Sequence, residues 1–201
     1  MKEFKLILIL IICLFLGTCN GTDTGTTNNY YSTSDNTSTS SVIIYPISYS
    51  SVYDGNDFGD IAPNYCYGTD SSGFTAAPFY STSTIDLKDR LPSSKWSNTV
   101  YSRQGHIIST SWESLWDGNI DMSLHEAEVI ADNDSTGELG FWTGTKSDGT
   151  FSGDNCRDWS SDTSTDNGTW GSFLTKESSI WIDNSTVPCN YSRYVLCFKY
   201  D

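Results

Sequence analysis

The two cysteines at the C-terminus limit how this chain can fold. The chain ends in PCNYSRYVLCFKYD, in which Cys189 and Cys197 flank an aromatic and β-branched run that is typical of a strand. A strand rises about 3.3 Å per residue, so the two Cα atoms would lie roughly 26 Å apart, whereas a disulfide needs them within about 7 Å. Each of these cysteines therefore needs a partner elsewhere in the chain.

The N-terminus has the pattern of a secretory signal peptide. A short charged start precedes an uninterrupted apolar stretch, residues 6–16, which is too short for a permanent membrane span and is followed by small residues. We therefore expect residues 1–18 to be removed and the protein to be exported. Because export leads to an oxidising compartment, the cysteines are expected to form bridges rather than metal sites or catalytic thiols.

Cys19 follows the residues LGT, and this stretch resembles the signal of bacterial lipoproteins, in which the cysteine becomes the acylated N-terminus. Cys13 would leave with the signal peptide, so five of the six cysteines would remain, and acylation of Cys19 would leave four to pair. We therefore expect a lipid anchor at Cys19 that holds the protein to a bacterial outer membrane or cell surface. The alternative is ordinary cleavage, which gives a soluble secreted protein.

The remaining chain divides into a tether and one domain. Residues 19–41 are nearly all Ser, Thr, Asn and Gly, a composition too polar to pack, and we predict a flexible tether. Residues 42–201 are predicted to form one α+β domain that is rich in loops and has few helices. Helical turns are expected at 85–91 and at 111–118, where Gly118 ends the turn. Strands are expected at 42–49, 105–110, 139–145, 178–183 and 193–200.

The charge of the chain excludes several kinds of partner. Its 11 Lys and Arg residues face 25 Asp and Glu residues, which gives a formal net charge of −14. Nucleic acid and heparin are therefore poor partners, because polyanions bind to clusters of Lys and Arg. Cations or neutral ligands fit this composition better.

Several stretches together resemble a known family. SWESLWDG, FWTGTKSDGTFSGDNCRDW and CNYSRYVLCFKYD are similar, in order and spacing, to segments of the endostatin domain of animal collagens, and CYGTDSSGFTAAPFYSTS resembles the segment around that family's first cysteine. The resemblance covers about residues 59–201, and the chain also resembles a set of spirochaete lipoproteins of unknown function. It implies an endostatin-like variant of the C-type-lectin-like fold, with a loop-rich mixed sheet, few helices and two nested disulfides.

The resemblance also implies how the cysteines pair. Four cysteines allow three pairings, and the strand geometry disfavours only the pairing of Cys189 with Cys197. Of the other two, the resemblance implies Cys66 with Cys197 and Cys156 with Cys189.

The departures from the family concern its ligands. The metal-binding histidines near the start of animal endostatin have no counterpart, since the only histidines are His106 and His125. The Arg-rich face that binds heparin is absent too, as are the Glu-Pro-Asn and Gln-Pro-Asp triplets with which C-type lectins hold Ca²⁺. The fold can therefore be shared without these ligands.

Three Asp-rich stretches, at 54–60, 132–138 and 162–168, carry oxygen ligands that suit Ca²⁺. None has the full spacing of a Ca²⁺-binding loop, and we predict solvated turns, with Ca²⁺ as the alternative. No other cofactor is expected. The sequence leaves the metal state unknown.

No catalytic motif stands out. The run HEAE at 125–128 lacks the second histidine of a zinc protease, and no Gly-x-Ser-x-Gly element occurs. We therefore predict a non-catalytic protein, with a hydrolase as the least favoured alternative.

The tryptophans suggest where a ligand would bind. Trp142 and Trp181 are expected in the core, whereas Trp159 and Trp170 flank a polar loop within 148–172 and are predicted to contact an extracellular protein or glycan. The predicted function is adhesion or ligand capture at the cell surface. The alternative is a soluble structural or envelope protein without a specific ligand.

Overall fold

The computed structural model describes residues 40–48, 51–69, 73–130 and 140–201. The predicted signal peptide, the lipidation site Cys19, the tether up to residue 39 and the Asp-rich stretch 132–138 lie outside the described residues. The first described strand begins at Ser41, one residue before the predicted start of the domain.

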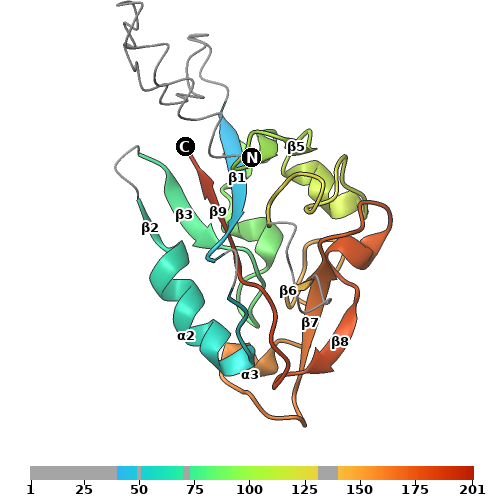
Figure 1. Cartoon of the computed structure of the whole chain (residues 1–201). Helices are drawn as coiled ribbons and strands as arrows, with labels where there is room; N and C mark the ends of the chain where they lie inside the picture. The colour runs from blue at the N-terminus through green and yellow to red at the C-terminus, as the bar shows by residue number, and fades with distance from the viewer. Residues whose placement is uncertain (1–39, 49–50, 70–72, 131–139) are drawn as a thin grey trace, which may run out of the picture. The chain divides into compact units, whose positions relative to one another are not determined.

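A six-stranded mixed sheet contains the C-terminal strand near its middle. The strand order is β2–β3–β9–β1–β4–β5, in which β9 pairs antiparallel with both β3 and β1, and β1 pairs parallel with β4. Figure 1 shows β1 and β9 side by side, with α2 continuing into β2 at one edge of the sheet. The strands are β1 (Ser41–Pro46), β2 (Gly68–Thr69), β3 (Thr75–Pro78), β4 (Thr99–Ser102), β5 (Ile107–Ser109) and β9 (Leu196–Tyr200).

A second, three-stranded antiparallel sheet has the order β6–β7–β8. Its strands are β6 (Gly140–Trp142), β7 (Asn167–Ser172) and β8 (Ser185–Pro188). Helical structure in the described residues is limited to α2 (Gly55–Cys66), the short α3 (Cys156–Trp159) and the 3-10 turns η1 (Leu87–Arg90), η2 (Ser93–Lys95), η3 (Glu113–Asp117) and η4 (Ser179–Trp181). The predicted α+β class, rich in loops and poor in helices, is confirmed.

The six-stranded sheet separates two apolar cores. Along β1, Val42 and Ile44 are buried while Ile43 and Tyr45 are half-buried, so alternate side chains point to opposite faces. The larger core lies on the Val42 face and includes Phe79, Trp112, Phe141, Trp181 and Phe198. The smaller core lies on the other face, beneath α2, and contains all four of the domain's cysteines.

Two disulfides lie within the smaller core. Cys66 at the end of α2 is bonded to Cys197 of β9, and Cys156 is bonded to Cys189, with Cα–Cα distances of 5.3 and 5.6 Å. These are the two pairs that the family resemblance implies. In the chain-entropy picture, loops of 131 and 33 residues contribute about 5 and about 4 kcal/mol of stability.

Helix α2 replaces the solvated turn predicted at 54–60. Asp54 caps it, because its carboxylate accepts hydrogen bonds from the backbone N–H groups of Asn56 (3.1 Å) and Asp57 (2.9 Å). Phe58, Ala62 and Cys66, spaced four residues apart, are buried on one face of the helix. The acidic residues of this stretch therefore serve as a cap and as the exposed side of a helix.

The strand predicted at 178–183 is wrong, because this stretch contains the 3-10 turn η4 (Ser179–Trp181) and no strand. Ser178 has a φ of 67°, which turns the chain before it enters β8. Trp181 is buried, as expected for a core residue, and Trp142 is buried in β6. The helical turns expected near 85–91 and 111–118 are confirmed as η1 and η3, and Gly118 ends η3 with a φ of 98°.

No helix within the described ranges is both long and apolar enough to cross a membrane.

Candidate functional site

The polar loop in which the sequence places recognition contains a left-handed turn. Its four residues, Cys156 to Trp159, have φ values of 53, 55, 56 and 61°, although none is glycine. Backbone bonds close the turn, since the N–H of Trp159 donates to the carbonyl of Asn155 (2.8 Å) and that of Ser160 to the carbonyl of Cys156 (3.0 Å). A left-handed helix costs about 1–2 kcal/mol per ordinary residue, so the turn costs roughly 4–8 kcal/mol that its surroundings have to offset.

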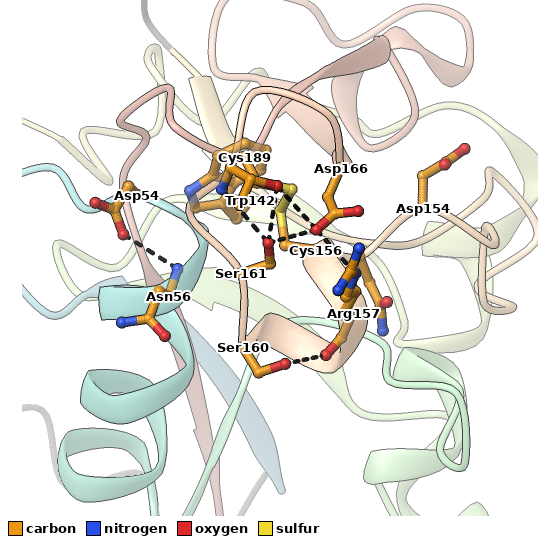
Figure 2. Close-up of a disulfide and its surroundings, with 12 residues drawn as sticks. Asp54, Asn56, Trp142, Asp154, Cys156, Arg157, Ser160, Ser161, Asp166 and Cys189 are labelled. Atoms are coloured by element: carbon orange, nitrogen blue, oxygen red, sulfur yellow. Dashed lines mark hydrogen bonds and ion pairs between the residues drawn. A yellow bond between two sulfur atoms is a disulfide. The ribbon is translucent and has the colours of Figure 1, made fainter.

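Polar contacts hold the outer side of this turn. Arg157 forms an ion pair with Asp166 at 2.9 Å, and Ser161 donates a hydrogen bond to the same carboxylate, beside the Cys156–Cys189 bridge (Figure 2). The Ser161 hydrogen bond, assisted by Thr163 and Arg157, lowers the pKa of Asp166. Because these side chains bond to one another, their contacts stabilise the turn.

Asp158 fastens the turn to a neighbouring segment. The pKa of its carboxyl group is lowered overall. Partial burial alone would raise this pKa, but hydrogen bonds from the side chain and backbone of Ser83 and from Asn155 have the larger combined effect. The Asn155 amide donates to this carboxylate at 2.6 Å. In the 162–168 stretch, where Ca²⁺ is the alternative to the predicted solvated turn, the Asp166 carboxylate is likewise bound by Arg157 and Ser161.

The prediction that Trp159 contacts a ligand at the surface is wrong. Its side chain is 3% exposed, its Nε1 donates to the carbonyl of Ser81 at 3.0 Å, and its ring lies 4.3 Å from that of Phe58. The left-handed turn directs the indole inward, beneath α2. Trp159 is therefore part of the smaller core.

Trp170 is half-buried in β7. Its Nε1 donates to the hydroxyl of Ser185 at 2.9 Å, and the Arg193 guanidinium lies 4.7 Å from its ring centroid. The structure does not bring Trp159 and Trp170 together in one surface site, because the first is enclosed in the core. The role predicted for Trp170 stays a prediction.

A different surface has the form of a ligand site. It is a groove of about 370 Å³ on the α2 side of the six-stranded sheet, and we call it the tyrosine groove. Three tyrosines, two cations and three small residues line it. They are Tyr45, Tyr65, Tyr67, Arg103, Lys199, Gly68, Thr69 and Ala76.

The groove lies where the helix stops covering the sheet. Ala76, Lys199 and Ile43 are paired across β3, β9 and β1, so their side chains share one row on the α2 side of the sheet. The small side chain of Ala76 leaves room in this row. Tyr65 and Tyr67, at the end of α2, rise beside it and are 68% and 53% exposed.

Cation and ring contacts fix the groove's side chains. The Arg103 guanidinium lies 5.0 Å from the centroid of Tyr45, and the Lys199 ammonium lies 4.7 Å from that of Phe74. Arg90 of η1 orients Tyr67, since its Nη1 donates to the Tyr67 hydroxyl at 2.9 Å while its Nε donates to the carbonyl of Tyr80 at 2.6 Å. A cation thus holds the exposed Tyr67 in place, and another lies over the half-buried Tyr45.

The charge of the groove is opposite to that of the whole chain. None of the described residues that line it is acidic, whereas the chain carries a formal charge of −14. Rings with two cations can bind a partly apolar, uncharged or anionic group. Among the described side chains, no group of three or more His, Cys, Asp or Glu residues could hold a metal ion.

Sequence reasoning did not find the groove, because its residues come from α2 and five different strands or strand ends. The one local signal was the close spacing of Tyr65 and Tyr67 in NYCYGT. No protein-family model matches this chain, and no curated protein is significantly similar to it.

Proposed function

We propose that this protein is an exported, lipid-anchored binding domain that captures an extracellular protein or glycan in the tyrosine groove, without catalysis. The observation that supports it is the groove itself, in which exposed Tyr65 and Tyr67 stand beside Arg103 on a chain that is otherwise acidic. Solvent-facing aromatic rings are favoured at recognition surfaces because they present a large, rigid contact area. The proposal names this groove and not the Trp159 loop, because Trp159 is buried.

We further propose that the domain is an endostatin-like variant of the C-type-lectin-like fold. The mixed sheet, the scarcity of helices and the nested pairs Cys66–Cys197 and Cys156–Cys189 support this assignment, since the resemblance implies each of them. The family's metal and heparin sites are not part of the proposal, because the chain lacks their residues.

The anchor is proposed at Cys19, and β1 begins at Ser41. If the 21 intervening residues form the flexible tether that their composition predicts, its root-mean-square span would be about 25 Å, which is enough to hold a domain clear of a membrane surface. A second candidate is the soluble secreted protein that ordinary cleavage would give.

The mass of the intact native protein tests the anchor. Acyl chains on a protein that begins at Cys19, together with a gain of about four hydrogens on reduction, would support the anchor and the two bridges. An unacylated mass would support the soluble secreted protein instead.

Groove variants test the binding role. Tyr67→Ala is expected to abolish binding to ligands captured by the wild type on glycan and matrix-protein arrays. Tyr191→Ala is the matched control, because Tyr191 is also an exposed tyrosine (46%) but lies outside the groove. Equal binding by the wild type and Tyr67→Ala would contradict the proposal, and so would blank arrays for the wild type.

A further inference from the structure

We propose that the tyrosine groove takes a sugar residue that carries a single carboxylate, such as the acidic end of a short glycan. The pyranose ring would lie against the tyrosines and the carboxylate would meet Arg103. This inference rests on the proposed binding function and adds the chemical class of the ligand.

The tyrosines supply the platform for the sugar ring. The apolar C–H face of a pyranose packs on the flat face of an aromatic ring, and Tyr65 and Tyr67 leave more than half of their surface exposed to solvent. The hydrogen bond from Arg90 holds the Tyr67 ring in place before any ligand arrives. A ring that is already ordered loses little entropy on binding.

Arg103 supplies the partner for the carboxylate. Its guanidinium lies over the Tyr45 ring, 5.0 Å from the centroid, and it makes no ion pair with any carboxylate in the described part of the chain. The in-plane N–H groups of a guanidinium match the two oxygens of a carboxylate. The residue is therefore oriented and charged but not neutralised by those groups.

The size and surroundings of the groove favour one acidic sugar over a polyanion. A volume of about 370 Å³ is close to the lower end of the usual range for small-ligand sites. Fixed charges are screened beyond about 8 Å in physiological salt, so one carboxylate in the groove responds mainly to the nearby cations. A long polyanion would also cover the acidic surface of a chain with a net charge of −14 and would be repelled.

An acidic peptide is the less favoured occupant. The sheet edge at the groove is β2, and its two residues, Gly68 and Thr69, offer too short a ladder for an added peptide strand. The same backbone groups, with the Thr69 hydroxyl, are instead suited to the scattered hydroxyl groups of a sugar.

The test compares two sugars that differ only in the acidic group. Methyl β-glucuronide and methyl β-glucoside are titrated into the mature protein while ¹⁵N–¹H spectra are recorded. The glucuronide is expected to shift groove amides saturably and to bind at least about tenfold more tightly than the glucoside, since a charge-assisted hydrogen bond is worth that much or more. Arg103→Gln should remove this preference, whereas Arg157→Gln, an exposed arginine outside the groove, should keep it.

Three outcomes would overturn the inference. The two sugars could bind equally, with Arg103→Gln having no effect, or neither could bind at about 20 mM, a concentration that would nearly saturate a site with a Kd of about 1 mM. A glutamate-rich peptide could also shift the groove amides while the glucuronide does not. None of these results alone refutes the binding role, which is judged by the Tyr67→Ala array experiment.

Discussion

Gly59 is expected to be the position of α2 least able to carry a side chain. A Cβ added to Gly59 would lie 1.7 Å from the carbonyl oxygen of Trp159, whereas such contacts need at least about 3.0 Å. The helix and the left-handed turn would have to separate by about 1.3 Å. Their contact includes the Phe58 and Trp159 rings, whose centroids are 4.3 Å apart in the smaller core.

Gly59→Ala is therefore expected to destabilise the domain by at least about 3 kcal/mol, the upper end of the usual cost of overpacking. Helix propensity alone predicts the opposite sign, because alanine in a helix interior is about 0.5–1 kcal/mol better than glycine. Close packing and helix propensity thus predict changes in the free energy of unfolding that have opposite signs and differ by about 4 kcal/mol.

Urea unfolding followed by tryptophan fluorescence measures the difference. Asp60→Ala is the control, because Asp60 is the next residue of the same helix and is exposed, so its replacement should change stability by less than about 0.5 kcal/mol. A Gly59→Ala variant as stable as the wild type, or more stable, would refute the close packing of α2 on the turn.

Three further predictions concern the smaller core. Trp159→Ala should lower the free energy of unfolding by about 3–5 kcal/mol, as for other buried tryptophans. A loss below about 1 kcal/mol, measured by urea unfolding, would contradict the burial of Trp159. Replacing Cys156 and Cys189 together by alanine should cost about 4 kcal/mol, so an unchanged urea midpoint would show that the bridge contributes nothing. Burial raises the pKa of Tyr80 to about 12, above the usual 10 of an unfolded chain. The free energy of unfolding is therefore unaffected by this group below pH 10, and up to about 3 kcal/mol of it is lost as pH rises towards 12. Tyr80→Phe should remove that part of the alkaline loss, and identical pH profiles for the two proteins would contradict the shift.

The sequence predicts those parts of the fold that depend on neighbouring residues. The alternation of Val42 and Ile44 with half-buried neighbours in β1, and the run that forms β9, were recognisable because a strand repeats every two residues. Helix α2 was missed because Gly, Asn, Asp and Pro63 all weaken helix propensity. The signal that predicts this helix is the four-residue spacing of Phe58, Ala62 and Cys66 after the capping Asp54.

The candidate site could not be predicted in the same way. The inward direction of Trp159 follows from four successive left-handed residues, and of the residues in CRDW only Asp158 is of a type that adopts this conformation even occasionally. The groove depends on strand register, which places Lys199 beside Ala76, and on Arg103 reaching Tyr45 from the end of another strand. Such long-range pairings are set by the whole sheet and not by local patterns.

The central place of β9 affects the order in which the chain can fold. Tyr200 is paired with Val42, 158 residues earlier, and with Thr75, so β9 lies between two strands that precede it by more than 100 residues. Pairings this distant in sequence fold slowly. The main sheet therefore stays incomplete until β9 has been made, and Cys66 can close on Cys197 only after the 131 residues that follow it have been added.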